Sequence, residues 1–317
     1  MRKHFFSIIT PTYNRAERLI KAFNSLCAQT FKDFQWIIVD DGSTDETDQV
    51  IAGFIQKANF DIVYHKISHG GKHMATRAAY EIASGKWVFE LDSDDELYDS
   101  NTLNNLYGLI DTLPKNCNCI GGCFIDQHNN IFPEIHGDYI DYDINSYVDT
   151  FCNSQHLLNI AWLMKMDYAR SVLPPAIQDN LTYFPEGVIN IRRALKATGF
   201  HLRIFNQPWY RYNMYNSDSV SVHTNKTNAY WYYAKSLLET FHEYNLLYKY
   251  PEFIKHLSKS LINETPSDRS VFVNYTTFKQ IGRPGVFYKL LLRLFCKRLL
   301  SISHNEIWVL GIKINKS

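Results

Sequence analysis

Apolar and polar positions alternate along the first hundred residues in two rhythms. Short apolar runs have the length of buried strands, and the segments between them place apolar residues every three or four positions, as an amphipathic helix does. Strands that alternate with helices predict right-handed crossover units and a parallel sheet flanked by helices. The expected strands cover 5–9, 34–39 and 61–67, and the expected helices cover 15–29, 46–57 and 74–83.

A fourth expected strand lies within residues 86–98, and the rest of the chain is organised around it. Trp87, Phe89 and Leu91 fall on one face of an extended segment and Val88 falls on the other, which is typical of a strand buried in a mixed or parallel sheet. The strand then ends abruptly in acidic residues, which no core tolerates without compensation.

Asp92, Asp94 and Asp95 place three carboxylates within four residues. Like charges this close repel one another, so the turn is either fully solvated or neutralised by a cation. Ligands of open α/β sheets sit beyond the carboxyl ends of the strands, and hard oxygen ligands there suit Mg²⁺ or Mn²⁺ bridging substrate phosphates. This position favours the cation over the alternative, a polar turn that caps a helix starting near Ser100.

Beyond Ser100 the alternation is less regular. The polar stretch 127–143 carries the turn signals of a hairpin or a lid. After about Asn225 the composition shifts and the pattern is largely helical, so we expect two domains, 1–225 and 226–317. The remaining expected elements are a helix from about 100 to 113, strands at 119–126, 158–166 and 201–206, helices at 184–198, 230–244, 252–262 and 286–302, and a strand-like segment at 307–314.

With 317 residues and 45% hydrophobic content, the chain is long enough to bury one large core or two smaller ones. Its formal net charge of +1 argues against general nucleic-acid binding. The first ten residues lack the features of a signal peptide, and no run approaches the ~20 apolar residues of a membrane span. We therefore expect a cytoplasmic protein.

Six cysteines fit a reducing compartment, because they form no dense or regular disulfide framework. Cys117, Cys119 and Cys123 are close enough in sequence to suggest a metal site. Their spacing is not that of a zinc knuckle, however, and small thiols in an apolar strand are more typical of a core. We predict that these three thiols are core residues.

Two further strand ends face the same edge as the acidic turn. Residues 40–43, Asp-Asp-Gly-Ser, offer carboxylates to a ribose hydroxyl or a base N–H, and the helix start behind them favours a phosphate. Lys72 follows two glycines, which allow close backbone approach, and its ammonium is a point charge for phosphate. Each has an ordinary alternative, a structural turn and a solvated lysine. Together with the acidic turn they predict a site for a nucleotide diphosphate and a divalent cation.

Four short motifs lie at these strand ends. They are residues 7–15, Ser-Ile-Ile-Thr-Pro-Thr-Tyr-Asn-Arg, residues 39–45, Val-Asp-Asp-Gly-Ser-Thr-Asp, residues 70–73, Gly-Gly-Lys-His, and residues 92–94, Asp-Ser-Asp. In this combination the chain resembles the family 2 glycosyltransferases, in particular bacterial enzymes that add single sugars to cell-surface polysaccharides. The resemblance covers roughly residues 6–221. It implies the GT-A nucleotide-diphospho-sugar transferase fold, a mostly parallel central sheet flanked by helices, with a helical C-terminal extension.

The resemblance also implies a set of donor-binding residues. These are Pro11, Thr12, Tyr13, Asp41, Lys72, Arg77, Asp92 and Ser93. Within this set, Asp41 is expected to contact the base, most often uracil, and Asp92 to face the ribose. In the matched Asp-x-Asp signature, Asp94 would hold a Mn²⁺ or Mg²⁺ ion on the diphosphate, with Asp95 as a second ligand.

The expected catalytic base is less clearly marked. The resembled family usually places it in a Glu-Asp pair at the start of a helix under the acceptor, whereas this chain has Glu186 followed by Gly187. We predict that Glu186 is the base, against the alternative of a carboxylate that only caps the helix. The chain lacks the Gln-x-x-Arg-Trp motif and transmembrane helices of processive synthases, which indicates transfer of one sugar per encounter.

These observations predict an inverting, metal-dependent glycosyltransferase. It would move a sugar from a nucleotide-diphosphate donor, UDP-linked, to a hydroxyl of a glycan or lipid-linked glycan in surface polysaccharide biosynthesis. A sugar nucleotidyltransferase, the alternative enzyme, should carry a Gly-rich basic loop after its first strand, where this chain has Thr-Pro-Thr-Tyr-Asn-Arg. A receiver-like Mg²⁺-binding signalling domain, an alternative of another class, places its acidic pair at the first strand and needs less than half this length.

Residues 284–302 combine apolar positions near helical spacing with interleaved lysines and arginines. Such a helix either lies on an anionic membrane surface or packs on the catalytic domain or in a homodimer. Acceptors of the resembled family are often lipid-linked, and this favours a peripheral position on the inner membrane face.

Overall fold

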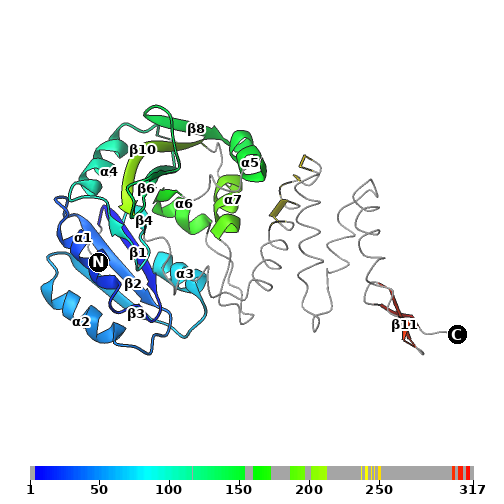
Figure 1. Ribbon diagram of the computed structural model, residues 1–317, viewed down its shortest axis with the longest axis horizontal. Helices are drawn as coiled ribbons and strands as arrows, with labels where there is room; N and C mark the ends of the chain where they lie inside the picture. The colour runs from blue at the N-terminus through cyan, green and yellow to red at the C-terminus, as the bar shows by residue number, and fades with distance from the viewer. Residues whose placement is uncertain are drawn as a thin grey trace. The chain divides into compact units, whose positions relative to one another are not determined.

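The structure is a computed structural model of the 317-residue chain (Figure 1). The chain forms two compact units, Met1–His223 and Thr224–Ser317. The structure describes residues 4–115, 117–153, 160–172, 186–196, 201–212, 237, 240–241, 244, 246, 249–250, 302–303, 306–309 and 312–314.

A sheet of ten described strands forms the centre of the first unit, and its main path follows the order β3-β2-β1-β4-β9-β6-β10-β5 (Figure 1). The strands β1 to β4 are parallel, as the alternation predicts, and the strands beyond them run in both directions. The bounds are β1 Phe6–Thr12, β2 Phe34–Asp40, β3 Asp61–Lys66, β4 Trp87–Glu90, β5 Glu96–Leu97, β6 Cys119–Ile125, β7 Ile131–Phe132, β8 Tyr139–Asp143, β9 Ala161–Lys165 and β10 His201–Arg211.

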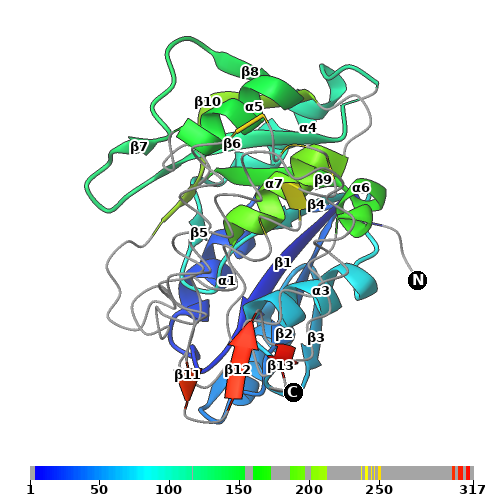
Figure 2. The same cartoon turned by 90° about the vertical axis from the view of Figure 1, so that its right-hand side faces the viewer.

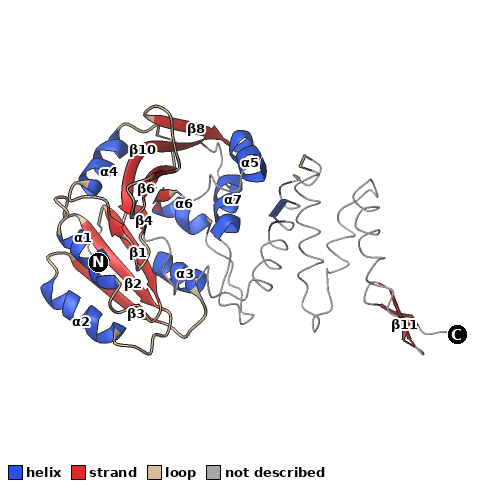
Figure 3. Cartoon of the chain, viewed as in Figure 1, coloured by secondary structure: helices blue, strands red, loops and turns tan. Residues whose placement is uncertain are grey.

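Helices cover both faces of the parallel strands (Figures 1, 2 and 3). On one face, Phe23 of α1 stacks on Phe54 of α2 with ring centroids 4.2 Å apart, and Trp36 of β2 lies beneath them. On the other face, α3 buries Ala75 and Ala79 completely. The bounds are α1 Leu19–Cys27, α2 Thr47–Lys57, α3 Lys72–Ile82, α4 Thr102–Asp111, α5 Ile144–Asn153, α6 Met166–Ser171 and α7 Glu186–Lys196.

The first strand is longer than expected, because it continues through Pro11 to Thr12. Proline has no N–H to donate and is normally excluded from a central strand. Here β4 ends opposite β1 at the pair Ile9 and Glu90, with Leu91 N–H donating to the Ile9 carbonyl. The backbone N atom of Pro11 faces the same side of β1 as the backbone of Ile9. On that side β4 has already ended, so the missing N–H of Pro11 leaves no hydrogen bond of the sheet unmade.

The strand β10 also continues past its expected end at Asn206. The register against β6 shifts on both sides of Pro208, which places the proline at an irregularity rather than in a regular ladder. The next residue, Trp209, packs its ring so closely on Gly122 of β6 that a Cβ at that glycine would overlap it. The polar stretch 127–143 forms β7 and β8, which pair with β6 and β10 respectively.

The thiols of Cys117, Cys119 and Cys123 are buried at or in β6. Burial raises the pKa of Cys119 to about 12 and that of Cys123 to about 11, so both thiols stay protonated at neutral pH. This placement agrees with their prediction as core residues.

The described part of the second unit includes a three-stranded antiparallel sheet of β11 (Ile302–Ser303), β12 (Glu306–Val309) and β13 (Ile312–Ile314). Ile302 pairs with Ile307, so it is a strand residue and not the end of the helix expected over 286–302. The segment 284–301 lies outside the described residues, as does the helix expected at 252–262. None of the helices that the structure describes is long and apolar enough to cross a membrane.

Candidate nucleotide-binding site

The candidate site lies where the parallel strands β1 to β4 end. Because these strands are parallel, the loops that follow Thr12, Asp40, Lys66 and Glu90 meet at one edge of the sheet. Ligands of open α/β sheets bind at this edge. Polar contacts between the loops show that they form one connected structure.

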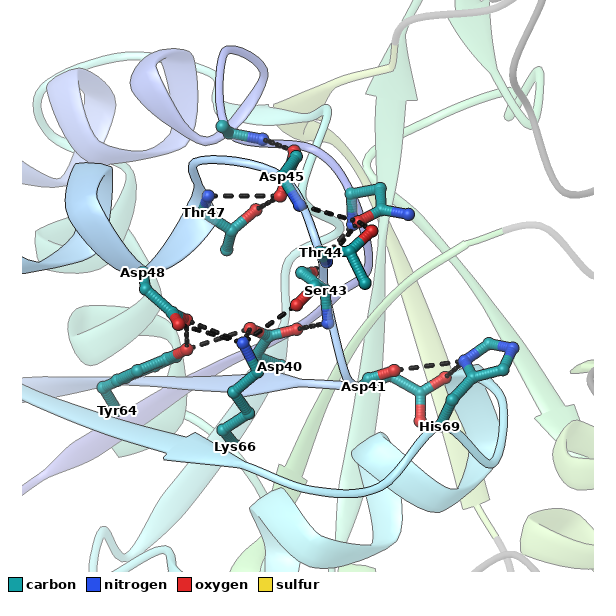
Figure 4. A network of polar contacts seen from close by, with 12 residues as sticks. Asp40, Asp41, Ser43, Thr44, Asp45, Thr47, Asp48, Tyr64, Lys66 and His69 are labelled. Atoms are coloured by element: carbon teal, nitrogen blue, oxygen red, sulfur yellow. Dashed lines mark hydrogen bonds and ion pairs between the residues drawn. The ribbon is translucent and has the colours of Figure 1, made fainter.

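The carboxylate of Asp41 is bound to the loop after β3. Asp41 is buried, and its two oxygens accept hydrogen bonds from the backbone N–H groups of Gly70 (2.7 Å) and Gly71 (2.8 Å). Nδ1 of His69 lies 2.8 Å from Oδ2 of the same carboxylate (Figure 4). Gly71 has a φ of 94°, a conformation that glycine adopts without a Cβ clash. Asp41 therefore orders the Gly-Gly-Lys loop.

The neighbouring carboxylate, Asp40, orders the turn after β2. It is fully buried, and it accepts hydrogen bonds from the Ser43 N–H (2.8 Å) and the Tyr64 hydroxyl (2.9 Å). Lys66 Nζ lies 2.9 Å from Asp48, which also contacts the Tyr64 hydroxyl (Figure 4). Burial and the two carboxylates raise the pKa of Tyr64, so its hydroxyl remains a donor. Asp40 therefore stabilises the turn itself, which is the structural alternative given above for residues 40–43.

Asn14 joins the loop after β1 to the same turn. Its side-chain oxygen accepts hydrogen bonds from the backbone N–H groups of Thr44 (2.8 Å) and Asp45 (3.3 Å). The backbone N–H of Asn14 donates to Ser43 Oγ (2.8 Å). Asn14 has a φ of 50°, in the left-handed region that asparagine tolerates better than most residues. The first two loops are therefore held in one fixed arrangement.

An aromatic pair lies beside these loops. The Tyr13 ring stacks on the His69 imidazole with centroids 4.3 Å apart and planes 23° apart. Tyr13 is 41% exposed and His69 40%, so this pair remains accessible to a ligand. The Oγ1 atom of the buried Thr12 has no hydrogen-bond partner among the described residues. The exposed ring surface is suited to stacking with a planar base.

Two cationic side chains neutralise the acidic turn after β4. Lys72 Nζ lies 2.8 Å from Oδ2 of Asp92, and Arg15 Nη1 lies 2.6 Å from Oδ2 of Asp94. The Arg15 and Asp94 side chains are largely buried, at 13% and 15% exposed, so this pair is screened less than a surface pair. The backbone of the turn is closed by Asp95 N–H donating to the Asp92 carbonyl at 3.1 Å. Ser93 and Asp95 are buried.

The acidic turn offers the hard oxygen ligands that Mg²⁺ and Mn²⁺ prefer. Among the described ranges, no group of three or more His, Cys, Asp or Glu side chains is arranged to hold an ion. Mg²⁺ at phosphate-transfer sites is usually held by one or two carboxylates together with substrate phosphates. Asp94 and Asp95 fit an ion that arrives with a diphosphate, and such an ion would compete with Arg15 for Asp94.

The remaining expected site residues lie on α3 and α7. Arg77, in the second turn of α3, forms an ion pair with Glu81 (3.1 Å). Glu186 is the first residue of α7, as the expected helix start requires, and its side chain lies outside the described part of the structure.

The sequence model described as Glycosyl transferase family 2 matches residues 7–172, just over half of the chain. The chain belongs to glycosyl transferase family 2. This confirms the resemblance drawn from the motifs at the strand ends. Every expected site residue except Glu186 lies within the matched segment.

Curated relatives match part of the chain. A PGL/p-HBAD biosynthesis glycosyltransferase of Mycobacterium bovis is 34% identical over 110 residues, 35% of this chain and 43% of that protein. A GalNAc(5)-diNAcBac-PP-undecaprenol beta-1,3-glucosyltransferase of Campylobacter jejuni is 33% identical over 144 residues, 43% of this chain and 44% of that protein. The chain thus spans less than half the length of these relatives.

A solved structure extends the likeness in fold over most of the chain. The crystal structure of S. aureus TarS 1-349 in complex with UDP-GlcNAc matches with a TM-score of 0.61 and 17% sequence identity. The match covers 94% of this chain and 82% of that chain. With the family match, it confirms the expected GT-A fold.

Several residues that build this family 2 site were not among the expected ones. Arg15 pairs with Asp94 across 79 residues of sequence, and His69 and Asn14 hold neighbouring loops together. Sequence spacing carries no signal for such long-range pairs. A usable signal existed for Arg15, since it follows a strand whose end shares the edge with the acidic turn.

Proposed function

We propose that this family 2 protein is an inverting, metal-dependent transferase that moves one sugar from a UDP-linked donor to a hydroxyl of a glycan or lipid-linked glycan. The observation that carries the proposal is the pair of ion pairs at the acidic turn, Lys72 with Asp92 and Arg15 with Asp94. When a diphosphate and its cation bind at this edge, the lysine and arginine can turn to the phosphates and the aspartates to the cation. The UDP-GlcNAc bound to TarS supports the choice of donor, and the name of the Campylobacter relative supports a lipid-linked acceptor.

The nucleoside of the donor would lie against the first three loops. Tyr13 with His69 offers a stacking surface for the base, and it follows Pro11 and Thr12 at the end of β1. Each Asp41 oxygen accepts one loop N–H, and Oδ2 also contacts His69, so Oδ1 keeps a second lone pair for a base N–H. Base recognition and loop order would therefore share one carboxylate.

The reaction would take place beyond the acidic turn. Asp94 and Asp95 would hold a divalent cation, which would supply positive charge to neutralise the leaving group. Lys72, at the start of α3, adds a second positive charge when it leaves Asp92, and Asp92 is then available to the ribose hydroxyls. Glu186 would take the proton of the acceptor hydroxyl while that oxygen attacks the anomeric carbon opposite the diphosphate. Attack from that side inverts the anomeric configuration.

The two alternative functions have less support. The loop after β1, where a nucleotidyltransferase needs glycines for a phosphate, is instead closed by Asn14 against Ser43 and Thr44. The acidic pair Asp40 and Asp41 lies at the end of the second strand, not of the first as in a receiver-like domain. Family membership also favours sugar transfer over both.

A thermal-shift screen of nucleotide sugars tests the proposed donor. The full chain is heated with each nucleotide sugar in the presence of Mn²⁺, and UDP and at least one UDP-sugar are expected to raise the melting temperature. Ligand at ~100 times its Kd adds about 2.7 kcal/mol to the free energy of unfolding, which is readily detected. If GDP- or dTDP-sugars stabilise the protein and UDP-sugars do not, the donor carries that other nucleotide. If no nucleotide sugar stabilises the protein, the proposed function is contradicted.

We further propose that the protein works at the inner membrane face, in contact through 284–301. The full chain should sediment with anionic liposomes at low salt, since each Lys or Arg near an anionic surface adds about 1 kcal/mol of attraction. A chain truncated before Arg283 should stay in the supernatant and still bind UDP. If the full chain ignores such liposomes, or the truncated chain does not fold, these residues belong to the protein core or to a homodimer contact.

A further inference from the structure

A buried guanidinium in α7 lies at the junction of three elements. Arg193 is only 3% exposed, and its Nη2 donates hydrogen bonds to the Glu90 carboxylate and to the Tyr80 hydroxyl (3.2 Å). The Tyr80 hydroxyl donates to the same Glu90 oxygen, which closes a triangle of three polar groups. Nη1 of Arg193 donates to Asn190 in its own helix at 3.0 Å.

Two further elements hold Arg193 in place. Its guanidinium carbon lies 5.6 Å from the centroid of the Trp162 ring in β9, within the range of a cation–π contact. The Tyr168 hydroxyl of α6 donates to its backbone carbonyl. Arg193 is therefore fixed through both its side chain and its backbone. Figure 2 shows α3, α6 and α7 gathered beside β4 and β9.

Each element in the triangle begins with a candidate site residue or ends just before one. Tyr80 belongs to α3, which begins at Lys72, and Glu90 is the last residue of β4, two positions before Asp92. Arg193 belongs to α7, which begins at Glu186. Seven residues of α-helix rise by about 10 Å, so the contact made by Arg193 lies about two turns behind the helix start.

A buried ion pair of this kind has a poor stability rationale. The cost of desolvating two charges often exceeds their attraction, and apolar side chains of the same volume frequently give an equally stable protein. Burial, with the Glu90 carboxylate next to it, raises the pKa of Tyr80 well above its ordinary value, so the hydroxyl stays a donor. Beyond stability, the triangle fixes the position of α7 relative to β4. The planar guanidinium can make these hydrogen bonds in only one placement of the helix.

We propose that Arg193 is a positioning residue which, through Glu90 and Tyr80, sets the start of α7 against the acidic turn and the Lys72 end of α3. The proposal rests on the proposed function, since it gives the three elements their roles in one reaction. A general base displaced by about 1 Å loses on the order of 10²-fold in rate, so loss of the triangle is expressed in turnover and not in donor binding.

Kinetics on three variants separate positioning from stability. Glu90→Gln keeps the shape of the side chain and removes its charge. Arg193→Lys keeps the positive charge and removes the planar guanidinium with its several N–H donors. The triple variant Tyr80→Phe, Glu90→Met, Arg193→Met replaces the triangle by apolar groups. We expect the triple variant to melt near the wild type, to keep its KM for the UDP-sugar within about threefold, and to lose about tenfold or more in kcat. Arg193→Lys should recover part of that loss. Wild-type kcat in a well-folded triple variant would overturn the proposal.

Hydrogen exchange on the full chain tests the same coupling without any activity. In Glu90→Gln the amides of the first turns of α7 should exchange about tenfold faster, while those of β1 and β2 are unchanged. Glu134→Gln, which alters an exposed carboxylate outside the triangle, should leave α7 unchanged. Unchanged exchange of α7 in Glu90→Gln would overturn the proposal. A wild type that binds no nucleotide and transfers no sugar would instead refute the proposed function, and the exchange result would still decide the coupling.

Discussion

Asp94→Asn should abolish sugar transfer while leaving the fold intact. The amide cannot supply the anionic oxygen that a divalent cation needs beside a diphosphate. It also leaves Arg15 without the carboxylate 2.6 Å away, so a positive charge that was paired becomes available at the same place. Transfer rates with a UDP-sugar and acceptor measure the effect, and a loss of more than about 10³-fold is expected from removing a metal ligand together with its charge.

The fold is checked separately, because the Arg15–Asp94 pair is largely buried. The melting temperature of Asp94→Asn should fall by only a few degrees, as asparagine still accepts a hydrogen bond from Arg15. Asp111→Asn, which changes an exposed carboxylate at the end of α4, is the matched control and should behave as the wild type. Near-normal transfer by Asp94→Asn in EDTA would remove the metal from the mechanism.

Glu186→Gln should lower turnover by about 10²-fold or more and leave donor affinity near normal. A positioned general base typically contributes 10² to 10⁴ in rate, and glutamine keeps the size of the side chain without its basicity. A fall in kcat with unchanged KM for the UDP-sugar identifies an interaction used only in the transition state. Single-turnover assays with saturating donor measure this split.

Glu186→Asp is the informative companion variant. It keeps a carboxylate but withdraws it by one methylene, so it should lie between the wild type and the glutamine variant. If Glu186→Gln turns over at the wild-type rate, Glu186 only stabilises the start of α7. Asp179 and Asp218 are then the next candidates for the base.

The parallel half of the fold was predictable because its signal is local. The strands β1, β2 and β4 are short, mostly apolar runs, and β3 carries an apolar centre at residues 62–64. The helical spacing between the strands leaves one topology, a set of right-handed crossovers. Parallel strands put their ends at one edge, so the meeting of Asp41, Lys72 and Asp92 follows from order alone. The buried thiols of β6 were predictable for the same reason, since an apolar run of that length reads as a strand.

Features that depend on distant neighbours were not predictable. Pro11 belongs to β1 only because β4 ends opposite Ile9, and nothing near Pro11 in sequence records where β4 ends. The strand β10 passes Pro208 because an irregularity against β6 absorbs it. The side chains that neutralise the acidic turn, Lys72 and Arg15, come from other loops. The sequence suggested only solvent or a metal ion for that role. In the second unit, Ile302 continues an apolar helical spacing although it pairs as a strand.

The central claim, that the acidic turn binds a nucleotide diphosphate through a divalent cation, is tested most directly by calorimetric titration of UDP into the full chain. With Mn²⁺ present, the wild type should bind UDP, and in EDTA the affinity should fall by at least about tenfold. Without the ion no free positive charge offsets the diphosphate at the acidic turn, because Lys72 and Arg15 are paired with Asp92 and Asp94. Asp94→Asn should bind UDP weakly under both conditions. Equal affinity with Mn²⁺ and with EDTA, in both the wild type and Asp94→Asn, would contradict the account.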